Sequence, residues 1–110
     1  MIEIPKDECI RRQKWHGKPL VELAPDYIRW KECKRVYRDS IVLNQADTAL
    51  GIAYFTYDED ASAVGDICGL VCSRNRYDIF YTCFRDYDLN GNVEKLTKRG
   101  KKVVMVEHIA

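Results

Sequence analysis

The chain has 110 residues, of which 46% are hydrophobic and 32% are charged, and its formal net charge is +1 at neutral pH. This composition excludes an intrinsically disordered chain, a helical membrane-spanning protein and a strongly basic nucleic-acid-binding protein. The length predicts a single domain over residues 1–110, because two halves would each be too small to bury an adequate core.

The cysteines and the first residues indicate the compartment. The chain contains Cys9, Cys33, Cys68, Cys72 and Cys83. An odd number leaves at least one thiol unpaired in any disulfide scheme, and the first residues lack the basic-then-apolar layout of a secretory signal. The sequence therefore predicts free thiols and a cytoplasmic protein that does not enter a membrane.

The first predicted elements are a short strand at residues 20–23 and a helix at residues 26–39. Pro25 and Asp26 favour a helix start, since proline is tolerated at the first helical position and a carboxylate is stabilised near the positive end of the helix dipole. At 100° per residue, four basic side chains fall on one arc beside an apolar arc. The basic arc contains Lys31, Lys34, Arg35 and Arg38. We therefore predict an amphipathic helix with a basic outer stripe.

The middle of the chain predicts a strand, a turn, a second strand and a helix. Residues 41–43 predict a short strand, residues 44–47 a polar turn, and residues 49–57 a strand that is apolar on both faces. Such a strand is central and buried. The acidic residues 58–60 end this strand and provide capping oxygens for a second helix at residues 61–73.

The C-terminal third predicts a hairpin. Residues 77–88 are rich in β-branched and aromatic residues, which indicates a long strand. Asn90 and Gly91 are the dipeptide that a type I′ turn prefers, and this turn would pair Asp86 with Lys95 across the two strands.

A turn at Arg99 and Gly100 would then lead into a last strand at residues 103–108, which completes a meander. We therefore predict an α+β fold with a mixed or antiparallel sheet and two helices. The element order is that of a ferredoxin-like β-α-β-β-α-β arrangement followed by a C-terminal β-meander. If the last strand lies at an edge of the sheet, it would allow a homodimer to form.

One segment of the predicted third strand invites comparison with RNA-binding proteins. Residues 51–57 match the RNP1 signature of RNA-recognition motifs at the glycine, the small residue and two aromatic positions, but Leu50 and Ile52 depart from it. This comparison supplies an alternative function, a single-stranded RNA-binding domain in which Tyr54 stacks on bases. The N-terminal residues that would join Tyr54 are Arg11, Arg12, Lys14 and Trp15.

Signatures of catalysis and cofactor binding are absent from the sequence. It has two histidines, no glycine-rich phosphate or dinucleotide loop and no serine nucleophile elbow. Cys68 and Cys72 have no second cysteine pair with the spacing of a zinc knuckle. Residues 86–91 match half of an EF-hand loop, but Thr97 replaces its bidentate glutamate. We predict no catalytic residue, no cofactor and no metal site.

The remaining features favour a non-enzymatic binding protein that acts through protein–protein contacts. Residues 1–40 carry ten basic and seven acidic side chains. Residues 41–70 carry five acidic side chains and no basic ones, and residues 71–110 carry eight basic and five acidic side chains. We expect an inhibitor or adaptor of the kind that phages and mobile elements encode, for example an anti-CRISPR-like viral protein, with a protein partner favoured over nucleic acid. The predicted contact residues are Lys31, Lys34, Arg35, Arg38, Asp58, Glu59 and Asp60.

Overall fold

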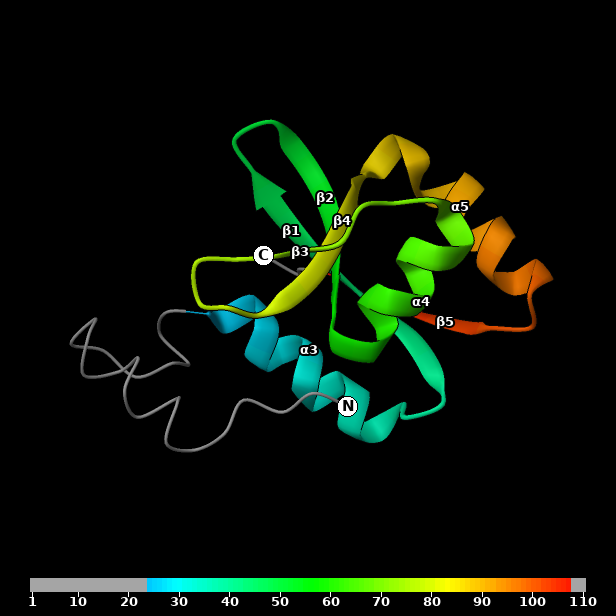
Figure 1. The fold of residues 1–110 in the computed structure, drawn as a ribbon, viewed down its shortest axis with the longest axis horizontal. Helices are drawn as coiled ribbons and strands as arrows, with labels where there is room; N and C mark the ends of the chain where they lie inside the picture. The colour runs from blue at the N-terminus through cyan, green and yellow to red at the C-terminus, as the bar shows by residue number, and fades with distance from the viewer. Residues whose placement is uncertain (1–23, 108–110) are drawn as a thin grey trace.

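The computed structural model describes residues 24–107, and Figure 1 shows the arrangement of their elements. In chain order these are α3 (Pro25–Val36), β1 (Ser40–Thr48), β2 (Gly51–Tyr57), α4 (Asp58–Cys68), β3 (Ser73–Arg74), β4 (Phe80–Arg85), a 3₁₀ turn η1 (Asp86–Asp88), α5 (Leu89–Lys98) and β5 (Lys102–Val106). The strand predicted at residues 20–23 lies outside the described residues.

The five strands form one mixed sheet in the order β3-β4-β2-β1-β5. β2 is antiparallel to both of its neighbours, whereas β5 runs parallel to β1 at the far edge. The predicted α+β class and the central position of β2 are confirmed. The described residues contain three α-helices rather than two, and the ferredoxin-like topology is not confirmed. The predicted C-terminal meander is wrong, because β5 crosses to the opposite edge from β4.

Side-chain alternation along β1 divides the core into two layers, one on each face of the sheet. Val42 packs with Tyr27 and Trp30 of α3. Ile41 and Leu43 point to the other face, where they pack with side chains of α4 and α5. The sheet is therefore covered by α3 on one side and by α4 and α5 on the other.

The first helix and the hairpin that follows it differ from their predicted bounds. α3 begins with Pro25 in its first turn, as predicted, but it ends at Val36. The polar turn predicted at residues 44–47 is wrong, because β1 continues through these residues and pairs them with β2. Asn44 is fully buried, with its side-chain amide 3.5 Å from the Asp26 carbonyl oxygen. Cross-strand pairing and burial therefore override the turn preference of this segment.

α4 also begins and ends earlier than residues 61–73. The three acidic residues form its first turn instead of preceding it, which places their charge at the positive end of the helix dipole. Gly69 ends the helix with a left-handed φ of 71°. A Cβ atom at Gly65 would lie 2.6 Å from the Cys72 sulfur, so the absence of a side chain allows the chain leaving α4 to fold back on the helix.

The hairpin predicted at Asn90 and Gly91 is wrong, and so is its register, because both residues lie in α5. The long strand predicted at residues 77–88 is shortened to β4, because residues 77–79 belong to the connection from β3, where Asp78 has a positive φ of 62°, and residues 86–88 form η1. Leu89, Val93 and Leu96 recur at helical spacing and pack with the core layer on the face of the sheet that α4 also covers. This apolar stripe makes the segment helical in spite of the local turn signal.

Candidate functional site

Lys34 and Asp60, two of the predicted contact residues, lie in the interior and bind each other. Lys34 Nζ donates to Asp60 Oδ1 at 2.8 Å and also to the Ser40 carbonyl oxygen. Asp60 Oδ2 accepts from the Val42 backbone N–H at 3.0 Å. Lys34 therefore does not belong to an outer stripe. The pair instead joins α3 and α4 to the beginning of β1.

Asp58 is likewise buried, with 3% of its surface exposed, and Glu59 is half-buried. The Tyr27 hydroxyl donates to Asp58 Oδ2 at 2.8 Å. Burial raises the pKa of Asp58, and the hydrogen bond from Tyr27 opposes this rise. The backbone at Asp58 has a positive φ of 49°, a conformation that asparagine and aspartate tolerate better than other side chains. The predicted acidic contact surface is therefore largely internal.

We expect Asp58→Asn to be at least as stable as the parent at pH 7, because it removes a buried charge, keeps an acceptor for Tyr27 and suits the positive φ. Asp58→Ala should lose about 1–3 kcal/mol, because it leaves the tyrosine hydroxyl without its partner. Because the pKa of Asp58 is raised in the folded state, the parent gains stability as the pH falls through that pKa toward the ordinary value of an aspartate, whereas Asp58→Asn should lack this gain. Urea denaturation of the three proteins at pH 7 and pH 5 tests the expectation; an Asn variant as unstable as the Ala variant would contradict it.

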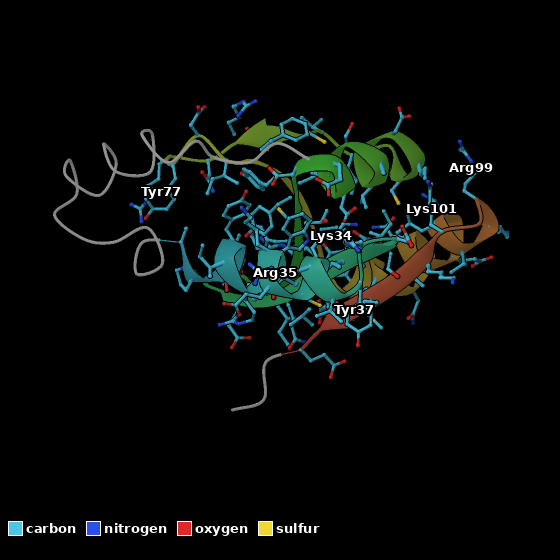
Figure 2. All side chains as sticks on the ribbon, turned by 90° about the horizontal axis from the view of Figure 1, so that it is seen from below. Lys34, Arg35, Tyr37, Tyr77, Arg99 and Lys101 are labelled. Atoms are coloured by element: carbon cyan, nitrogen blue, oxygen red, sulfur yellow. The ribbon has the colours of Figure 1, made fainter. Side chains whose placement is uncertain are left out.

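Exposed basic side chains lie on the two chain segments that lead into β1 and β5, and we call the surface formed by these segments the basic end. It consists of Arg35, Arg38, Arg99, Lys101 and Lys102. Ser40 and Lys102 are partners in the parallel pair of β1 and β5, so the segments that precede both strands meet there. Figure 2 shows Arg35 on α3, and Arg99 and Lys101 near the turn between α5 and β5, at some distance from Arg35. Within residues 24–107 none of the five forms an ion pair.

The turn between α5 and β5 has a local structural cause. Gly100 adopts a left-handed φ of 77°, and the backbone N–H of Lys101 donates to the Leu96 carbonyl oxygen at 3.1 Å. This closure satisfies a carbonyl at the end of α5 and carries the basic residues around the turn. Basic side chains are also stabilised near the negative end of the helix dipole. Lys98 is not part of the basic end, because it binds Glu94 at 3.1 Å.

Apolar surface adjoins these charges. Val36 is 73% exposed and Tyr37 is 48% exposed, and both lie where α3 ends. Arginine and tyrosine are the side chains most enriched at the energetic centres of protein interfaces, where an apolar contact is surrounded by polar groups. Asp39 is the one acidic residue in the same stretch of chain. The basic end thus combines unpaired positive charge with an exposed apolar contact.

The predicted stacking platform for RNA is not available on the surface. Tyr54 is 5% exposed, and its ring lies 5.9 Å from that of Phe84 in the layer covered by α4 and α5. The expectation of an exposed Tyr54 is therefore wrong, because two helices cover its face of the sheet. The four N-terminal residues that would join it, Arg11, Arg12, Lys14 and Trp15, lie outside the described residues.

Four of the cysteines lie within the described residues, and burial makes three of them weak nucleophiles. Cys33, Cys68, Cys72 and Cys83 are free thiols. Burial raises the pKa of Cys33, Cys68 and Cys83, so little thiolate forms at neutral pH. Among residues 24–107 there is no group of three or more metal-ligating side chains arranged to hold an ion.

Sequence reasoning identified Arg35 and Arg38 but missed the second half of the basic end. The signal was present as a run of four basic residues around a glycine, residues 98–102. Its significance depends on the parallel pairing of β1 with β5, which the predicted meander did not contain.

No protein-family model matches the chain, and no curated protein matches it in sequence. In the part of the chain that the structure describes, none of the helices has the length and apolar composition needed to cross a membrane.

Proposed function

We propose that this protein works without catalysis, by binding an acidic surface of a protein partner at the basic end. The observation that supports the proposal is the meeting of two basic segments, distant in sequence, beside the exposed Tyr37. Five positive charges without internal partners would steer a complementary surface into place and fix its orientation. An inhibitor or adaptor, of the kind that phages and mobile elements encode, would act through such a surface in the cytoplasm.

A protein partner fits these features better than single-stranded nucleic acid. Sequence-tolerant binding of single strands relies on several aromatic platforms along a basic groove. Tyr54 is buried, and the exposed aromatic side chain at the basic end is Tyr37. An exposed tyrosine between two exposed arginines of the same segment resembles the centre of a protein interface.

The test is a comparison of three proteins in affinity capture from lysate of the source cell, with and without nuclease. The basic-end variant carries Arg99→Glu and Lys101→Glu. The matched control carries Arg76→Glu and Lys95→Glu, which make the same change in net charge on exposed residues outside the basic end. We expect the parent and the control to retain the same discrete protein after nuclease treatment. The basic-end variant should bind that protein at least about tenfold more weakly.

Circular dichroism and thermal unfolding establish that all three proteins are folded. Raising the salt concentration should weaken capture by the parent, because surface charges are screened over about 8 Å at physiological ionic strength. Retention of the same protein by the basic-end variant would overturn the proposal. Retention that disappears with nuclease would instead favour the nucleic-acid alternative.

A further inference from the structure

A second feature, separate from the basic end, is a cavity of about 560 Å³ between α4 and the β3–β4 edge. Among residues 24–107 its lining includes Asp58, Glu59, Ser62, Ala63 and Asp66 from α4, together with Arg74 and Phe80. The volume lies in the range of pockets that hold small organic ligands.

The charge of this lining is unbalanced. Three carboxylates face one guanidinium, and none of the three forms an ion pair within residues 24–107. Among residues 24–107, Glu59 Oε2 is buried and has no hydrogen-bond partner. Asp58 is almost completely buried, and within the same residues its hydrogen-bond donor is the neutral Tyr27 hydroxyl. A buried acceptor without a donor is costly, so this site favours a ligand that brings N–H groups.

The guanidinium already present does not balance these acids. Arg74 Nη1 donates to the Asp78 carbonyl oxygen at 2.9 Å, and it lies 3.9 Å from Asp78 Oδ1. The Arg74 guanidinium also lies 5.8 Å from the centre of the Phe80 ring. Arg74 is thus held at the edge of the cavity by contacts with the β3–β4 segment.

We infer that the cavity binds an organic cation, a guanidinium or ammonium group carried on a short alkyl stem. Glu59 and Asp66 would accept hydrogen bonds from the cation, while Ala63 and Phe80 provide apolar surface for the stem. A bare metal ion fits less well, since the described residues contain no group of three ligating side chains with suitable spacing. The inference does not depend on the function proposed for the basic end.

Three probes test this inference by isothermal titration calorimetry in low-salt buffer. Agmatine represents a free small cation, acetyl-Gly-Arg-Gly-amide represents an arginine side chain of a protein, and the same peptide with citrulline is neutral and of nearly equal shape. We expect saturable binding of at least one guanidinium probe, and binding of the citrulline peptide that is at least about tenfold weaker, which corresponds to about 1.4 kcal/mol. Agmatine alone would indicate a small-molecule ligand, and the arginine peptide alone would indicate a protein side chain.

Variants assign the binding to the cavity. Glu59→Gln and Asp66→Asn should each weaken binding of the guanidinium probe by about tenfold, or about 1.4 kcal/mol. Asp66 is exposed, so its substitution leaves the fold intact even if Glu59→Gln does not. Asp47→Asn, an exposed carboxylate outside the cavity, should leave binding unchanged. The inference is overturned if neither guanidinium probe binds, if citrulline binds equally well, or if Asp47→Asn weakens binding as much as Asp66→Asn.

Discussion

Lys34→Met should destabilise the fold by about 3–5 kcal/mol, because it leaves the Asp60 carboxylate buried without its cation. The Lys34 and Asp60 side chains are 9% and 4% exposed. Methionine fills most of the space that the lysine stem occupies, so the loss of stability measures the effect of removing the charge rather than the effect of a cavity. The free energy of unfolding, measured by urea denaturation, is the quantity to compare.

Two further variants separate the charge from other effects. Lys31→Met removes a less buried lysine of the same helix, whose Nζ lies 5.7 Å from the centre of the Tyr27 ring, and it should change the free energy of unfolding by no more than about 1 kcal/mol. Combining Lys34→Met with Asp60→Leu removes both charges and should recover a large part of the loss, because a buried ion pair is often replaceable by apolar side chains. A Lys34→Met protein as stable as the parent would show that Asp60 is not a buried charge.

This ion pair also supports the basic end. Lys34 donates to the carbonyl oxygen of Ser40, the residue that begins β1. Arg38 lies two residues before this point, and Lys102 is the strand partner of Ser40. Loss of the pair should therefore disturb the region in which the two basic segments meet.

Trp30→Ala should be comparably damaging, with a loss of about 3–5 kcal/mol. Trp30 is fully buried, and its ring lies 6.1 Å from that of Tyr27 and 5.7 Å from that of Tyr57. Its Nε1–H donates to the Val42 carbonyl oxygen at 2.8 Å. The substitution removes the centre of one core layer and a hydrogen bond together. Because domains of this size are stable by only about 5–15 kcal/mol, the variant should be partly unfolded at 37 °C.

Trp30→Phe and Tyr37→Ala serve as the comparisons. Trp30→Phe keeps an aromatic ring but leaves the Val42 carbonyl oxygen without this donor, and should lose about 1–3 kcal/mol. Tyr37 is exposed at the end of the same helix, so Tyr37→Ala should stay within about 0.5 kcal/mol of the parent while weakening partner capture at the basic end. Thermal unfolding followed by circular dichroism gives all three values, and equal losses for Trp30→Ala and Tyr37→Ala would contradict the assigned core.

Residues with strong local or periodic signals were predicted well. Pro25 set the beginning of α3, and the segment 49–57, apolar on both faces, indicated the central strand that the structure has as β2. The failures occurred where two local signals competed. Asn44 suggested a turn but lies buried in β1, and Asn90-Gly91 suggested a hairpin but lies in α5, because partners distant in sequence stabilise these segments.

The sequence by itself determined the composition of an α+β domain, the free cysteines and the positions of its charges along the chain. Tertiary structure alone decided which charges face water. Lys34 and Arg35 are neighbours in one helix, yet Lys34 points to Asp60 in the interior while Arg35 reaches the surface. The physical reason is that burial and pairing depend on contacts between α3, α4 and β1. The parallel pairing of β5 with β1 likewise created the basic end, because it brought residues more than sixty positions apart to the same end of the sheet.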